Sequence, residues 1–96
     1  MTAPAEISVT FAVWGPIERD DLPGLCERVC AVFASSDARV AVCDVQGVEP
    51  NAVTVDALAR LQLAARRRGY QVRLRNTSRE LRELVSFMGL TDVLPE

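Results

Sequence analysis

Residues 40–45, which read Val-Ala-Val-Cys-Asp-Val, form a short and almost entirely apolar run. Strands of this composition are typical of parallel sheets that are covered on both faces. We therefore expect this stretch to be a strand buried on both faces. The segments on either side of it decide what kind of sheet it joins.

The segment that follows is predicted to contain a loop, a helix and a second strand. Residues 47–53 include Pro50 and Asn51 and are expected to form the loop. A helix is predicted over about 54–68, because its apolar residues recur at helical spacing and a glycine follows it. Its expected buried arc consists of Ala57, Leu58, Leu61 and Ala65. Residues 70–75 alternate between apolar and polar side chains, which indicates a strand.

The segment before residue 40 is predicted to hold a strand and a helix. Apolar and polar side chains alternate over 7–14, which is the pattern of a half-buried strand. A helix should begin at Asp20 or Asp21, with Pro23 in its first turn. Its core face consists of Leu22, Leu25, Cys26, Val29 and Phe33.

The C-terminal part has the strongest capping signal in the chain. Thr77 and Glu80 form a capping box if Thr77 is the cap residue, and Gly89 closes the helix that follows. Residues 91–94 are expected to add a terminal strand. Short loops between alternating strands and helices favour a largely parallel α/β sheet with right-handed crossovers.

The composition excludes most catalytic machinery. The chain has no histidine, and all 11 of its basic residues are arginine. It therefore has no Ser-His-Asp or Cys-His catalytic centre, no imidazole metal ligand and no P-loop lysine. Asp44 could serve as a metal ligand or as an acid/base group, but we expect it to bond backbone amides of the next loop. We expect no enzyme activity, no cofactor and no metal.

The cysteines and the N-terminus indicate a cytoplasmic protein. The three cysteines are expected to be small buried side chains in a reducing compartment, because an odd number is a poor disulfide framework. Residues 1–6 carry no basic residue, so we expect no signal peptide, and no apolar run is long enough to insert in a membrane.

Three segments together resemble the STAS domain, which anti-sigma-factor antagonists and sulfate transporters share. They are residues 42–48, residues 58–69 with their run of arginines, and residues 78–90, which begin Ser-Arg-Glu-Leu. The order and spacing of the segments carry the resemblance. It implies a single STAS-like α/β domain over residues 1–96, with a mixed, mostly parallel four-stranded sheet and helices mainly on one face.

The resemblance implies a non-enzymatic, bacterial partner-switching module that regulates transcription. Such a domain docks on an anti-sigma factor, often a serine kinase of the histidine-kinase-like ATPase type, until a phosphate at the start of its second helix repels the partner. Here the phosphoacceptor positions hold Ala52 and Val53, which lack a hydroxyl group. Thr54, one residue later, is the remaining candidate phosphoacceptor, and it is also a candidate helix cap.

The surface implied to bind the partner spans residues 48–63 and continues along the exposed side of the second helix. Leu63 lies outside the buried arc, and an exposed apolar residue at such a place is a candidate contact, as is Trp14 on the first strand. The candidate partner-binding residues are Asn51, Val53, Thr54, Ala59, Arg60, Leu63 and Arg67.

Two alternative functions and one assembly stay open. The chain could be an accessory STAS subunit of a lipid-transport ABC system, or a phosphate- or nucleotide-binding domain that uses Arg60 and Arg67. Nucleic acid is not an expected partner, because the net charge is -2. Family members commonly carry one more strand before residues 7–14, so an uncovered sheet edge would favour a homodimer.

Overall fold

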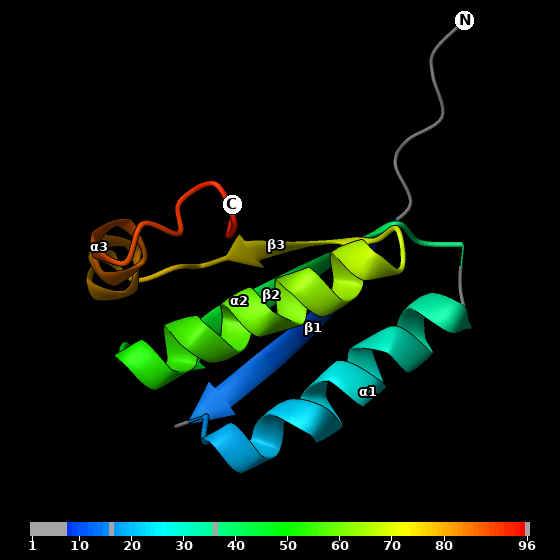
Figure 1. Ribbon diagram of the computed structural model, residues 1–96, viewed down its shortest axis with the longest axis horizontal. Coiled ribbons are helices and arrows are strands. Elements are labelled where there is room, and N and C mark those ends of the chain that lie inside the picture. The colour runs from blue at the N-terminus through cyan, green and yellow to red at the C-terminus, as the bar shows by residue number, and fades with distance from the viewer. Residues whose placement is uncertain (1–7, 16, 36, 96) are drawn as a thin grey trace, which may run out of the picture.

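The computed structural model describes residues 8–15, 17–35 and 37–95. Along the chain these form β1 (Ser8–Gly15), the short 3-10 helix η1 (Arg19–Asp21), α1 (Leu22–Ala34), β2 (Val40–Val48), α2 (Ala52–Arg67), β3 (Gln71–Arg75) and α3 (Arg79–Phe87). Strands and helices alternate, as the sequence predicts (Figure 1). In the part of the chain that the structure describes, no helix is both long and apolar enough to cross a membrane.

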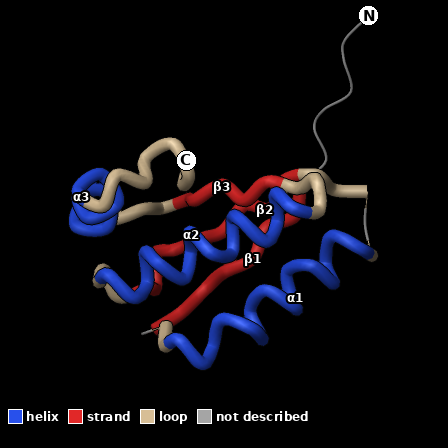
Figure 2. Tube along the Cα trace, in the orientation of Figure 1, coloured by secondary structure: helices blue, strands red, loops and turns tan. Residues whose placement is uncertain are grey.

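The sheet has three strands in the order β1-β2-β3, and both pairs are parallel. The apolar run is its central strand, paired with β1 on one side and β3 on the other (Figure 2). Its side chains facing the helices, Ala41, Cys43 and Val45, are buried, whereas Val42 and Asp44 on the opposite face are only half-buried. Val40, at the start of that opposite face, is buried. The expectation of burial on both faces is therefore correct for the face toward the helices and, on the other face, only for Val40.

The central strand is longer than predicted, because it continues to Val48 beyond a break in its register with β1. Ala12 pairs with Asp44, but Trp14 pairs with Gly47, so β2 carries one extra residue between these two pairs. This is a β-bulge, in which the extra residue is left unpaired, and pairing resumes at Trp14 and Gly47 so that β2 continues to Val48.

The prediction of a mixed, mostly parallel sheet of four strands is confirmed in part, because the described residues form three strands that are all parallel. Residues 91–94 form a turn rather than a strand, with Leu94 buried against the core. The first strand is found at Ser8–Gly15, and Ile7 lies outside the described residues.

The helix starts correct two capping predictions. The cap of α2 is Asn51, whose side-chain oxygen accepts a hydrogen bond from the Thr54 N–H at 2.9 Å. The cap of α3 is Ser78 rather than Thr77, because Ser78 has the extended backbone of a cap and accepts from the Leu81 N–H at 3.2 Å. In both cases the capping residue is polar, so the spacing of the apolar residues does not show where the helix begins.

The helices α1 and α2 lie side by side on one face of the sheet, and α3 lies beyond the carboxyl end of β3 (Figure 1). The main core lies between the sheet and these two helices, where Phe33 of α1, Leu58 and Leu61 of α2 and Val72 of β3 are almost completely buried. The opposite face of β1 is open in the described residues, since Thr10, Ala12 and Trp14 are exposed there.

The outer edge of β3 is closed by the protein itself. The amide of Gln62, on α2, donates to the carbonyl oxygen of Val72 at 2.6 Å and accepts from the Val72 N–H at 2.7 Å. Gln62 also donates to the carbonyl oxygen of Val93 at 2.9 Å, and the Leu74 N–H donates to the carbonyl oxygen of Pro95 at 2.8 Å. The Gln62 side chain and the Pro95 carbonyl group therefore bond to the outward N–H groups of Val72 and Leu74 and to the Val72 carbonyl group.

Candidate partner-binding surface

The start of α2 is where the resemblance places the regulatory hydroxyl, and Thr54 is completely buried there. Its hydroxyl oxygen has no hydrogen-bond partner among the described residues. The hydroxyl does not cap the helix, because Asn51 does. A kinase could reach Thr54 only if the start of α2 first separated from the sheet.

An exposed stripe runs along the outer side of α2. It consists of Val53, Asp56, Arg60, Leu63 and Arg67, and we call it the α2 stripe. These positions are three or four residues apart, so they project from one face of the helix. Val53 is 36% exposed and Leu63 is 48% exposed. Four of the residues predicted to bind a partner thus share one outward surface.

Two other predicted contacts are not on this surface, because α2 is covered over a wider arc than the apolar pattern suggests. The helix packs on the sheet and also contacts α1 and α3. Ala59 is consequently buried in the core, as is Thr54, so neither side chain is available to a partner. Asn51 remains half-buried at the end of the stripe, where its side chain is used as the cap.

The charges of the α2 stripe are partly balanced within it. The Nε atom of Arg60 lies 2.9 Å from the Oδ2 atom of Asp56, one helical turn earlier. The two side chains are largely exposed, so the pair contributes well under 1 kcal/mol to stability. Arg67 stands further along the stripe, in the last turn of the helix, where a cation interacts favourably with the helix dipole.

A hollow lies beside the start of the stripe, between segments that are far apart in the sequence. Its lining comes from η1 and α1, from the first turns of α2, and from Met88, the residue that follows α3. The lining residues are Arg19, Leu22, Ala52, Val53, Asp56, Ala57, Arg60 and Met88. Arg19, Leu22 and Met88 are not among the predicted contact residues, because no local pattern in the sequence indicates that they meet.

The remaining chemically active side chains have structural roles. Asp44 accepts hydrogen bonds from the Gln46 N–H at 3.0 Å and from the Asn76 amide at 3.1 Å, as expected for a residue that organises a loop.

Burial, with a smaller contribution from Asp44, raises the pKa of the Cys43 thiol to about 12. Burial and the neighbouring Cys30 raise the pKa of Cys26 as well. Thiols that stay protonated at neutral pH are poor nucleophiles.

No group of three or more potential metal ligands is present among the residues that the structure describes.

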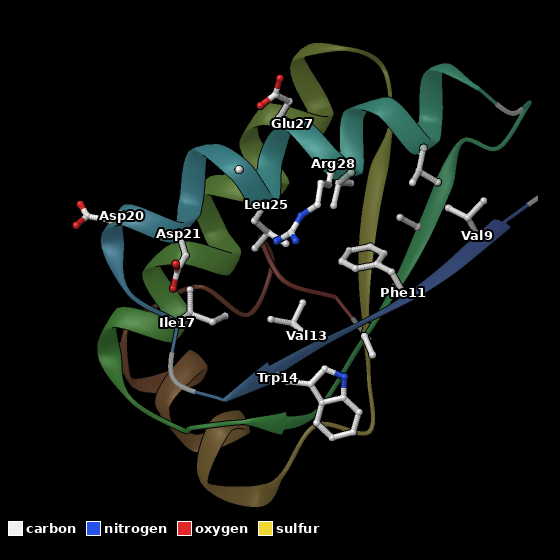
Figure 3. Close-up of a pocket in the computed structure, with 15 residues that line it drawn as sticks. Val9, Phe11, Val13, Trp14, Ile17, Asp20, Asp21, Leu25, Glu27 and Arg28 are labelled. Carbon is white, nitrogen blue, oxygen red and sulfur yellow. The ribbon is translucent and has the colours of Figure 1, made fainter.

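Trp14, the other candidate contact, is 75% exposed and packs over Gly47 of the neighbouring strand. A side chain of any size at position 47 would meet the indole ring. Trp14 lies on the open face of the sheet, away from the α2 stripe (Figure 3).

Comparisons with known proteins define the fold. No protein-family model matches this sequence, and no curated protein matches it. Among solved structures, the chain is similar to a sulfate transporter family protein from Wolinella succinogenes, with a TM-score of 0.65 and 20% sequence identity. The match covers 98% of this chain and 75% of that one. The chain therefore has a STAS-like α/β fold.

Proposed function

We propose that this chain is a non-enzymatic, cytoplasmic protein-binding module of the anti-sigma-factor antagonist type, which docks on its partner without the phosphate switch of the family. It binds an anti-sigma factor, or a serine kinase of the histidine-kinase-like ATPase type, through the α2 stripe and the hollow beside it. The observation that carries the proposal is Leu63, a large apolar side chain held half-exposed on a regular helix between Arg60 and Arg67. An apolar anchor surrounded by charged residues is a common arrangement in protein interfaces.

The residues at the start of α2 indicate that docking does not depend on phosphorylation of this part of the helix. Ala52 and Val53 have no hydroxyl group, and the hydroxyl of Thr54 is buried. A doubly charged phosphate placed at that buried position would be very costly. We expect the partner to bind without a phosphate-dependent step at this helix.

The test of the binding surface uses two matched variants. The chain is mixed with an anti-sigma factor encoded beside its gene, and the complex is followed by size-exclusion chromatography. Leu63→Asp should weaken binding about thirtyfold or more, as expected for loss of an apolar interface anchor. Phe87→Asp is the control, since Phe87 is 87% exposed on α3 and lies outside the α2 stripe. Normal binding by Leu63→Asp would show that this surface is wrong.

The test of phosphorylation uses intact mass measurement. The chain is incubated with ATP and the partner kinase, and its mass should stay unchanged. A phosphate added at Thr54 would contradict docking that is independent of phosphorylation, while leaving the binding surface to the first test.

One alternative function has an observation in its favour. The similar solved structure is described as a sulfate transporter family protein. The alternative is a role in transport, namely as an accessory STAS subunit of a lipid-transport ABC system; the neighbour supports the link to transport and not the lipid substrate. Co-elution with an ABC ATPase encoded beside a permease, in place of an anti-sigma factor, would favour this role.

The third possibility, a phosphate- or nucleotide-binding domain, has less support. Arg60 already pairs with Asp56, so the stripe offers an anion little uncompensated charge near this residue. Calorimetry with millimolar ATP and GTP should detect no heat of binding. A measurable heat that disappears in Arg67→Ala would instead favour this reading.

A further inference from the structure

The outer edge of β1 differs from the edge of β3 because no described residue pairs with it. β1 is the first strand in the sheet order, so one side of its backbone has no partner strand in the described structure. Its eight residues, Ser-Val-Thr-Phe-Ala-Val-Trp-Gly, contain no charge. Edge strands that must avoid other chains usually carry charges or proline, and β1 has neither.

A groove lies between this strand and α1, next to the free edge (Figure 3). Val9 and Phe11 of β1 are only half-buried in it, and Leu25 and Val29 of α1 form its inner wall. Alternate residues of an added strand would project toward the helices and enter this groove, because strand side chains alternate between the faces of a sheet. The groove therefore offers an extended segment both backbone hydrogen bonds and apolar contacts.

Charged residues of both signs line the groove. Asp20 and Asp21 stand at the end near Ile17, and Arg28 reaches into the groove from the middle of α1 (Figure 3). Glu27 also belongs to the lining, but its carboxylate points away from β1 (Figure 3). In the described part of the chain, no acidic side chain pairs with Arg28. A complementary segment would carry a carboxylate opposite Arg28 and a cation near the two aspartates.

A second copy of this chain does not meet these requirements. The β1 strand of another copy has no charged residue to place against Arg28. An antiparallel pair of β1 strands centred on Phe11 would also bring two Arg28 side chains toward each other. The charge pattern thus favours a different chain over self-association.

We propose that the outer edge of β1 binds an extended segment of a partner protein, which adds to the sheet as a strand, fills the groove with apolar side chains and pairs a carboxylate with Arg28. This surface is separate from the α2 stripe. Its failure in the test below would leave the proposed function intact, and loss of the α2 interaction would leave this site intact.

The test uses two synthetic ten-residue peptides of alternating valine and threonine, with a lysine at one end. One has glutamate at a central position, and the other has lysine there. Their binding to the isotope-labelled chain is measured by nuclear magnetic resonance titration. The glutamate peptide should bind about tenfold more tightly than the lysine peptide, because an attractive charge contact is replaced by a repulsive one.

Two charge-reversal variants show whether Arg28 makes this distinction. Arg28→Glu should reverse the preference between the peptides. Arg79→Glu is the matched control on α3, where Arg79 is paired with Glu83 and lies outside the groove, and it should keep the preference of the original chain. Bound peptide should also slow amide hydrogen exchange in residues 8–15 and leave residues 71–75 unchanged.

Each of four results would overturn the proposal. They are no binding of either peptide at millimolar concentration, an unchanged preference in Arg28→Glu, protection at β3 instead of β1, and a dimer that protects the β1 amides without peptide. The last result would assign the edge to a second copy of this chain.

Discussion

The two edge strands of the sheet, β1 and β3, differ in how their outer backbone groups are hydrogen-bonded. β3 is the shorter edge strand, with five residues, and the protein closes it with Gln62 and with the carbonyl group of Pro95. β1 has eight residues, and its outer side has no partner among the described residues. Within residues 8–15, 17–35 and 37–95, the longer and uncharged edge is therefore the one without a partner.

This difference shows how little is needed to close a sheet edge. The primary amide of Gln62 presents one donor group and one acceptor, as a peptide of a neighbouring strand does, and it binds both polar groups of Val72. No residue of α1 does the same for β1, because the side of α1 that faces β1 carries mostly apolar residues over a groove. Edge protection is thus local to β3.

The largest effect is expected from opening the closed edge. Gln62→Leu keeps a similar volume but leaves the buried N–H and C=O groups of Val72 without partners. We expect a loss of about 3 kcal/mol in the free energy of unfolding, since each unsatisfied buried group costs roughly 1–3 kcal/mol. The melting temperature should fall by roughly 15 °C in a domain of this size. Thermal and urea unfolding measure both quantities.

The control for this variant is Gln46→Leu, at an exposed position of β2. A surface substitution of this kind should change stability by less than about 0.5 kcal/mol. Equal stability of the Gln62→Leu and Gln46→Leu variants would mean that the bonds of Gln62 do not close the edge.

The closure of β3 also explains which parts of the fold the sequence predicts and which it does not. The central strand and the helices follow from local apolar patterns, and these elements are found. The predicted strand at 91–94 is a turn, and Gln62 and Pro95 form the hydrogen bonds to the outer edge of β3 instead. Gln62 bonds to residues 10 and 31 positions away, so no local pattern indicates its role.

The candidate site was likewise predictable only where local spacing decides the position of a residue. Val53, Arg60, Leu63 and Arg67 lie together because helical spacing alone fixes that they share a face. Thr54 and Ala59 were placed wrongly on the surface, because the width of the buried arc depends on α1 and α3 as well as on the sheet. The groove beside β1 was missed, since it exists only where α1 and β1 come together.

A smaller effect is expected at the end of β1, where Trp14 lies over the neighbouring strand. In Gly47→Ala the new Cβ atom would overlap the indole ring, so the ring must move. Because Trp14 is largely exposed, we expect a loss of only about 1 kcal/mol, together with a shift in tryptophan fluorescence. Fluorescence-monitored urea unfolding records both changes, since Trp14 is the single tryptophan.

Gly24→Ala provides the comparison for this variant. Nothing lies within 4 Å of the added methyl group, and alanine favours the helix, so stability should rise by about 0.5 kcal/mol. Unchanged fluorescence in Gly47→Ala would show that Trp14 does not rest on this glycine.

The smallest effect is expected from a charge on the open edge strand. Thr10 is exposed, so Thr10→Lys should change the free energy of unfolding by less than about 0.5 kcal/mol, measured by urea denaturation. The same substitution should weaken strand addition at β1, because lysine on an edge strand discourages pairing. A large loss of stability would indicate that β1 is already covered within the chain.

The most direct test of the difference between the two edges is amide hydrogen exchange of the chain alone, resolved by residue. We predict slow exchange for the Val72 and Leu74 amides, which are bonded to Gln62 and Pro95, and fast exchange for those β1 amides that do not face β2. Slow exchange at every amide of β1, matching that of Val72, would contradict an open edge and with it the binding surface inferred there.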